Sequence, residues 1–121
     1  MERPHKTLKI WGKILDLVKY TYTLTKAFPK EEVYVLTSQM RRAAVSIASN
    51  IAEGSARKTN PEKFHFYVIA RGSLSELDAQ LEISLALTYV SKDQASDLQL
   101  KLDEISKMLE GMLQHYSHQS P

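Results

Sequence analysis

The most restrictive feature of this 121-residue sequence is a spacing of apolar side chains by three and four residues, which recurs in four segments. The clearest case lies near the C-terminus, where Leu98, Leu102, Ile105, Leu109 and Met112 repeat in steps of four and three. This spacing places the side chains on one face of an α-helix. Only four Gly and four Pro interrupt the chain, and no segment alternates with the period of a strand. The sequence therefore predicts an all-α protein.

Breaks in the pattern place helices at about residues 7–27, 31–54, 61–90 and 92–115. Pro29 ends the first helix because the residue before a proline avoids helical torsion angles. Gly54 is expected to cap the C-terminus of the second helix. Asn60 is expected to cap the third, and Ser91 or Asp93 the fourth.

Each segment carries an apolar stripe. The stripes of the first three are Ile10, Ile14, Leu17, Thr21, Leu24 and Phe28; Leu36, Met40, Ala43, Ile47, Ile51 and Gly54; and Leu74, Leu77, Leu81 and Leu85. Gly72 interrupts the third segment and predicts a bend or a close contact. Short connections make neighbouring helices antiparallel, so we expect one domain, residues 1–121, folded as an antiparallel up-down-up-down four-helix bundle.

The second segment is unusual because, within residues 39–57, two adjacent arginines lead into a stretch in which small side chains recur. Ala44, Ala48 and Ala52 are spaced by four and predict a shallow groove beside the main stripe. A helix of the same bundle would pack on the stripe, and a helix of another subunit would fit the groove. Asn50 lies within this stretch and allows two interpretations, a structural hydrogen bond that fixes the helix register or a contact to a ligand.

Charge is unevenly distributed. Residues 1–60 hold 11 Lys and Arg against 5 Asp and Glu, a net charge of +6, whereas residues 61–121 hold 5 against 9, a net charge of −4. This asymmetry indicates either a nucleic-acid face or attraction between helices or subunits. The candidate phosphate contacts are Arg41, Arg42, Arg57, Lys58, Lys9 and Lys13. Cations after Gly54 also complement a helix C-terminus, which is the structural alternative for Arg57 and Lys58.

Motifs for catalysis are incomplete. The sequence has no Cys, no phosphate-binding glycine loop and no nucleophile elbow. A di-iron bundle needs two Glu-x-x-His motifs, and only Glu62 to His65 matches. His115 and His118 have metal-ligand spacing but are only two ligands. We expect a protein that is not an enzyme and binds neither metal nor cofactor. With no signal-peptide pattern and no apolar run of membrane-spanning length, we expect a cytoplasmic location and no membrane partner.

Several strings resemble one bacterial family. They are SQMRRAAVSI at residues 38–47, SNIAEG at 49–54, FPKEE at 28–32 and IARGSLSEL at 69–77. Together they resemble the four-helix-bundle family whose founding members are called 23S rRNA-intervening sequence proteins. Ala48 stands where members often carry Pro, which argues against a kink at that point.

The resemblance implies a left-handed four-helix bundle that assembles into a homopentameric ring. A related branch, the accessory protein of diversity-generating retroelements, is a basic pentamer that binds nucleic acid and a reverse transcriptase. We therefore expect a nucleic-acid-binding accessory or scaffold protein, with RNA or DNA, sister subunits and a reverse transcriptase as candidate partners. The alternative is a protein-interaction module that does not bind nucleic acid.

Overall fold

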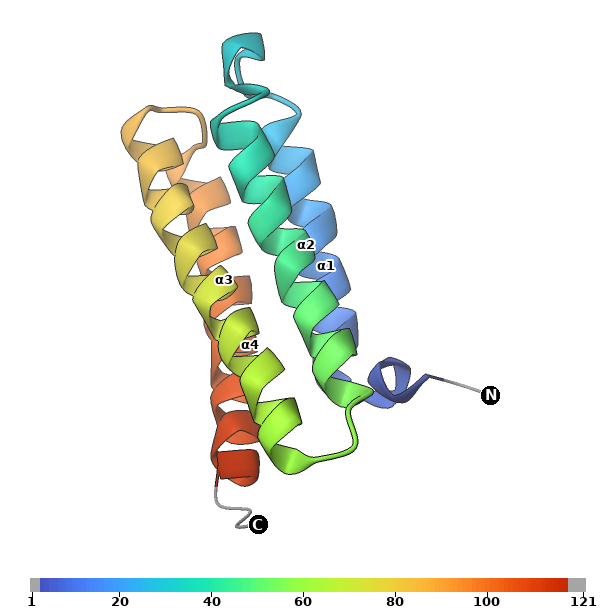
Figure 1. The fold of residues 1–121 in the computed structure, drawn as a ribbon. Coiled ribbons are helices and arrows are strands. Elements are labelled where there is room, and N and C mark those ends of the chain that lie inside the picture. Colours follow the sequence, from blue (N-terminus) through green and yellow to red (C-terminus); the bar gives the residue numbers. More distant parts are fainter. Residues whose placement is uncertain (1–2, 118–121) are drawn as a thin grey trace.

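Four long helices form an antiparallel up-down-up-down bundle in the computed structural model, which describes residues 3–117 (Figure 1). The helices are α1 (Lys9–Thr25), α2 (Leu36–Ser55), α3 (Asn60–Ala86) and α4 (Lys92–Ser117). Two short 3₁₀ helices, η1 (Pro4–Thr7) and η2 (Lys30–Glu32), precede α1 and α2. Each long helix packs against the helices next to it in the chain, and α4 closes the bundle against α1. Among the described residues there is no strand, so the predicted fold class is confirmed.

The predicted stripes form the core. Every stripe residue of the first two segments is buried, as are Leu98, Leu102, Ile105 and Leu109 of α4. The stripe predicted for α3 is correct except at its end, where Leu85 is 39% exposed and Ser84 is fully buried instead. Ser84 fits there because its hydroxyl donates to the Gln80 carbonyl oxygen at 2.8 Å.

The helix boundaries differ from prediction in two places. Helix α2 begins at Leu36 rather than near residue 31, because residues Lys30–Glu32 form the separate helix η2 and Val35 takes non-helical torsion angles (φ −120°, ψ −99°). The Glu32 carboxylate accepts hydrogen bonds from the Leu36 amide and the Tyr89 hydroxyl across this break. Helix α3 ends at Ala86 rather than at residue 90, because Thr88 takes a left-handed φ of 61°. The Tyr89 amide then donates to the Ser84 carbonyl oxygen at 2.9 Å, closing the helix end.

Two expectations at helix ends and bends are also corrected, and one cap is confirmed. Thr59, not Asn60, caps α3: its hydroxyl accepts from the Glu62 amide at 3.3 Å and donates to the Glu62 carboxylate at 2.7 Å. Ser91 caps α4, because its hydroxyl accepts from the Gln94 amide at 3.1 Å. The close contact predicted at Gly72 is absent, since a Cβ there would meet nothing within 4 Å, and α3 continues through this position. The bend predicted at Gly72 stays a prediction.

Gly54 is not a C-cap but a point where α2 and α3 approach very closely. It is helical and buried, and a Cβ on it would lie 2.7 Å from Tyr67 Cε1 and 3.1 Å from Phe66 Cβ. Tyr67 is buried beside it and shares a 3.0 Å hydrogen bond with the Ser55 hydroxyl. Burial raises the pKa of Tyr67 above its usual value. The absent side chain at Gly54 therefore allows a tyrosine ring to fill the space between the two helices.

We expect Gly54→Ala to lower the free energy of unfolding by about 1–3 kcal/mol, because a methyl group there overlaps Tyr67. Gly111→Ala is the matched control, since Gly111 is exposed on α4 with nothing within 4 Å of its Cβ position. The control should gain about 0.5–1 kcal/mol from helix propensity alone. Urea denaturation followed by circular dichroism measures both changes, and equal effects at the two glycines would contradict the steric explanation.

Candidate nucleic-acid interface

Arg41, the first candidate cation, makes intramolecular contacts with the C-terminal part of α1. It is half-buried, its Nε donates to the Thr25 hydroxyl at 2.8 Å, and its Nη2 donates to the Tyr22 carbonyl oxygen at 3.4 Å. Its guanidinium carbon lies 4.5 Å from the centre of the Tyr22 ring. The Tyr22 carbonyl also accepts from the Lys26 amide at 3.2 Å and the Thr25 hydroxyl at 3.3 Å, so Arg41 adds a further donor at the end of α1. The side chain therefore holds the N-terminal half of α2 against the end of α1.

Arg42, the next candidate, points in a different direction because consecutive helical residues differ by about 100°. Its side chain is exposed, and within residues 3–117 no hydrogen bond or ion pair holds it. Arg42 borders a hollow of about 710 Å³ on α2 that Tyr22 and Tyr34 also line. Of the two adjacent arginines, only Arg42 is available to a partner.

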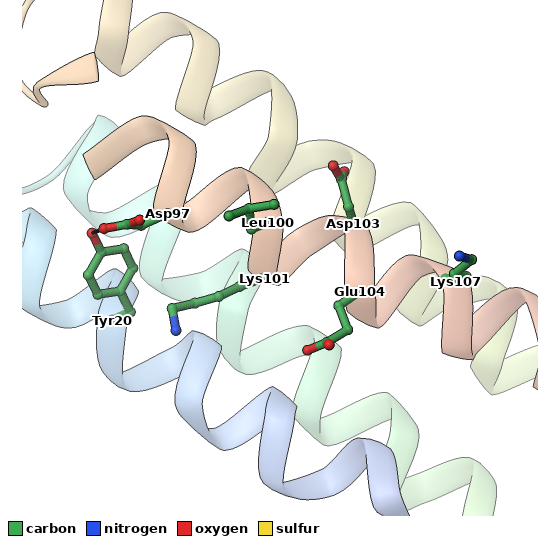
Figure 2. A pocket seen from close by; sticks show the side chains of 7 residues that line it. All are labelled: Tyr20, Asp97, Leu100, Lys101, Asp103, Glu104 and Lys107. Atoms are coloured by element: carbon green, nitrogen blue, oxygen red, sulfur yellow. Dashed lines mark hydrogen bonds between the residues drawn. The ribbon is translucent and has the colours of Figure 1, made fainter. Parts of the chain in front are cut away.

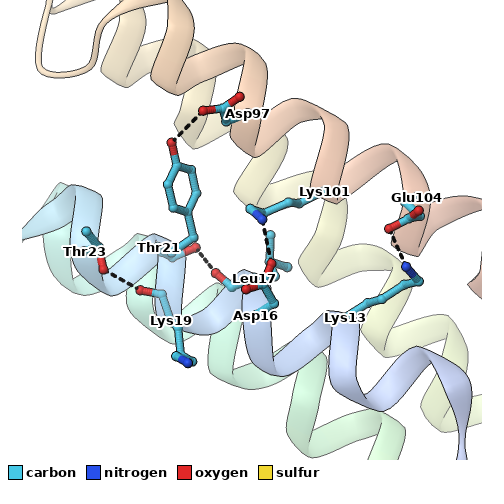
Figure 3. Close-up of polar contacts among 10 residues, drawn as sticks. Lys13, Asp16, Leu17, Lys19, Thr21, Thr23, Asp97, Lys101 and Glu104 are labelled. Atoms are coloured by element: carbon cyan, nitrogen blue, oxygen red, sulfur yellow. Dashed lines mark hydrogen bonds and ion pairs between the residues drawn. The ribbon is translucent and has the colours of Figure 1, made fainter.

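Lys13, another candidate, belongs to a polar seam between α1 and α4 (Figure 3). Its Nζ lies 2.8 Å from a Glu104 carboxylate oxygen, and Lys101 of the same seam lies 2.5 Å from Asp16. The hydrogen bond and positive charge of Lys101 hold the pKa of Asp16 below its usual value. Lys13 is thus paired, although at the surface, where such pairs contribute little stability.

A hollow of about 720 Å³ opens beside this seam (Figure 2). Asp97, Asp103 and Glu104 line it together with Lys101 and Lys107. Three carboxylates against two ammonium groups do not favour a polyanion. This hollow is therefore not a candidate for binding phosphates.

Arg57 and Lys58 lie at the opposite end of α2 from Arg41. Arg57 comes fifteen positions after Arg42 and just beyond the end of α2, and fifteen positions correspond to about 23 Å along a helix axis. The Arg57 guanidinium donates to Glu53 at 2.6 Å and lies over the Phe66 ring at 4.8 Å, while its buried Nε has no hydrogen-bond partner among the described residues. Lys58 is exposed and, within residues 3–117, no hydrogen bond or ion pair holds it. The six candidate cations therefore do not form one site.

The fold brings three of the candidates to one end of the bundle. Helix α1 begins, α2 ends and α3 begins at this end, and η1 lies against α2 there (Figure 1). The cations on these segments, which we call the basic end, are Arg3, Lys6, Lys9, Arg57, Lys58 and Lys63. The nearby carboxylates are Glu53, paired with Arg57, and Glu62, bonded to Thr59. Among the described residues of these segments, six cations against two engaged carboxylates give a positive balance of charge.

Sequence reasoning missed Arg3, Lys6 and Lys63 as members of the basic end. Antiparallel topology was the available signal, because it places the first turns of α1 and α3 beside the last turn of α2. Aromatic rings support this end: His5 packs edge-on against Trp11 at 4.4 Å between ring centres, which holds η1 to α1. The Lys63 ammonium group donates to the carbonyl oxygen of Ser55, the last residue of α2, at 3.1 Å. Its positive charge therefore also complements the negative C-terminal end of that helix.

The small residues of α2 have separate roles. Ala44 is fully buried, Ala48 packs partly against the core, and Ala52 lines a hollow of about 590 Å³ with η1. The Asn50 amide donates to the Ser46 carbonyl oxygen at 2.9 Å and to its hydroxyl at 3.2 Å, and Ser46 in turn shares a 2.8 Å hydrogen bond with Ser73 of α3. Asn50 is thus linked to α3 by hydrogen bonds that pass through Ser46, which is a structural role.

The histidines in the described part of the chain do not gather. His65 packs edge-on against Phe66, His115 packs against Tyr116, and His118 lies outside the described residues. Within residues 3–117, no three His, Asp or Glu side chains come together as a metal site requires. No helix in this range is both long and apolar enough to cross a bilayer.

The fold and the basic end define the class of protein: a small all-α bundle that carries a cluster of cations at one end. The chain belongs to the 23S rRNA-intervening sequence protein family, whose model matches residues 6–111. A crystal structure of a protein of unknown function from the S23 ribosomal protein family of Bacteroides thetaiotaomicron superposes with a TM-score of 0.80. The two sequences are 22% identical, and the match covers 86% of this chain and 97% of that one. No curated protein matches the sequence.

We expect Arg41→Met to lower the free energy of unfolding by about 1–2 kcal/mol, because the substitution removes two hydrogen bonds and a cation–π interaction. Arg42→Met, its sequence neighbour, should change stability by less than about 0.5 kcal/mol. Denaturant midpoints measured at low protein concentration compare the two. A similar destabilisation of both variants would show that Arg41 does not hold the end of α1.

Proposed function

We propose that this protein is a non-enzymatic, homo-oligomeric helical bundle of the bacterial cytoplasm that binds RNA or DNA. The observation that carries the proposal is the basic end, where segments distant in sequence bring six cations together. Four of them, Arg3, Lys6, Lys9 and Lys58, are exposed. Lys and Arg side chains bind nucleic acid by neutralising backbone phosphates and releasing counterions.

The site favours binding that does not depend on base sequence. Flexible lysine side chains on three segments contact phosphates without a fixed geometry, whereas reading a base requires rigid donors and acceptors. One bundle offers few contacts, so several copies in one assembly would strengthen binding through a high effective concentration. The family description refers to 23S rRNA, which makes RNA the first ligand to test.

A second candidate function is a protein-interaction module without nucleic-acid binding. It is favoured by the connection before α2, where Val33, Tyr34 and Val35 are 47%, 92% and 60% exposed. Exposed apolar groups gathered on one segment are typical of protein contacts. In this second function the connection would bind a reverse transcriptase or another protein. Such binding is compatible with self-association of the bundle.

The nucleic-acid proposal predicts weaker affinity on charge reversal at the basic end. We expect Lys6→Glu/Lys9→Glu/Lys58→Glu to weaken binding of labelled single-stranded and duplex RNA and DNA, measured by fluorescence anisotropy at several salt concentrations. The plot of log affinity against log salt concentration should also become shallower. For every phosphate that the variant no longer neutralises, its slope should fall by roughly 0.9 on duplex DNA and 0.7 on single strands.

The matched control is Lys26→Glu/Lys30→Glu/Lys92→Glu, which makes the same charge change at the opposite end of the bundle. It should retain most of the affinity. An equal weakening would assign binding to net charge rather than to the basic end. No binding by the unmodified protein at low salt would reject the proposal and leave the interaction module.

A further inference from the structure

A second repeat of threes and fours runs along the outer face of α2, opposite its core stripe. Its members are Ser38, Arg42, Val45, Ser49, Ala52 and Ala56. Steps of four and three, eighteen positions from Ser38 to Ala56, place them in one line about 27 Å long. We call this line the α2 outer stripe. All six are half-buried or exposed, and all but Arg42 have small side chains or a valine, so the surface along the line is low.

Two hollows lie over the α2 outer stripe. The first, of about 710 Å³, is lined by Ser38, Arg42 and Val45 and bordered by Tyr34 from the connection before α2. The second, of about 590 Å³, is lined by Ser49, Ala52 and Ala56 and bordered by η1. Val45 is 42% exposed and Tyr34 is 92% exposed. The stripe therefore lies in a trough, and its own members are small or apolar except for one cation, Arg42, which no carboxylate of the described residues pairs. Arg41, Arg3 and Glu53 also border the two hollows.

Helix α3 carries a matching line on its own outer face. Its members are Ile69, Gly72, Glu76, Ala79, Ile83 and Ala86, again in steps of three and four. All six are exposed, and Ile69 and Ile83 are 39% and 48% exposed. We call this line the α3 outer stripe. Helix α3 thus presents apolar side chains on two opposite faces, and only one of them packs inside the bundle.

Heptad spacing on an exposed face is the pattern that helices use to pack against one another. The two outer stripes have similar lengths, so one could lie along the other. Their charges are opposite, since Arg42 lies in one and Glu76 in the other. The halves of the chain that carry them have net charges of +6 and −4. Both stripes face away from the core, so they meet only between molecules.

We infer that the α2 outer stripe of one copy receives the α3 outer stripe of a second copy. This inference rests on the homo-oligomeric part of the proposed function and specifies the surfaces. Because the two stripes lie on different helices, the contact is heterologous: each copy uses one stripe toward each neighbour. Such contacts continue from copy to copy until they close into a ring or extend as a filament.

A complementation experiment tests the contact. Val45→Arg damages only the α2 outer stripe, and Ile83→Arg damages only the α3 outer stripe. Each variant alone should run at the mass of one 13.8 kDa chain in size-exclusion chromatography with light scattering, whereas the unmodified protein runs as a larger assembly. Mixing the two should give a particle of twice the chain mass, because one intact stripe remains on each partner and the two arginine-bearing stripes repel.

Leu100→Arg is the control, since Leu100 is 68% exposed on α4 and lies outside both stripes. It should assemble like the unmodified protein, and circular dichroism checks the fold of every variant. Full assembly by both stripe variants, or a mixture that stays at one chain mass, would overturn the inference and leave homo-oligomerisation itself standing. An unmodified protein that stays at one chain mass would overturn both. Nucleic-acid binding is tested separately, because none of these substitutions changes the basic end.

Discussion

The close approach of α2 and α3 is the constraint on which the rest of the structure depends. Gly54 leaves room for the Tyr67 ring, and Ser55 supplies the hydrogen bond that its buried hydroxyl requires. About two turns earlier along α2, Ser46 meets Ser73 across the same interface. These contacts set both the distance and the register of the central pair of helices. The other two helices then pack against this pair through larger aliphatic side chains.

Much of the fold follows from the sequence because burial is periodic. The stripes of α1 and α2 are buried at every predicted position, and helix number and direction follow from the breaks between them. Boundaries were harder to predict because they depend on contacts between distant segments. Glu32 looks like a first-turn residue of α2, but it bonds to Tyr89, 57 residues away. A left-handed Thr88 also has no sequence signal, since a β-branched residue seldom adopts this conformation.

The candidate site was only partly predictable for a related reason. Composition shows that the first half of the chain is basic, but not which cations are already engaged. Arg41 and Arg42 are equivalent in sequence, yet one is bonded to the end of α1 and the other faces a hollow. Lys13 is paired with Glu104, 91 residues away. Topology, rather than clustering in sequence, is what gathers Lys9, Arg57 and Lys58 at one end.

The hydrogen bond from the Tyr89 hydroxyl to the Glu32 carboxylate joins the α3–α4 connection to the α1–α2 connection. Both connections lie at the end of the bundle opposite the basic end. The Glu32 carboxylate raises the pKa of Tyr89, and Phe28 packs against the same tyrosine ring at 5.2 Å between ring centres. The exposed Val33 and Tyr34 directly follow this anchor in the chain. The connection that carries these exposed side chains is therefore fixed to the bundle at its base, through the Glu32–Tyr89 hydrogen bond and the packing of Phe28 on Tyr89.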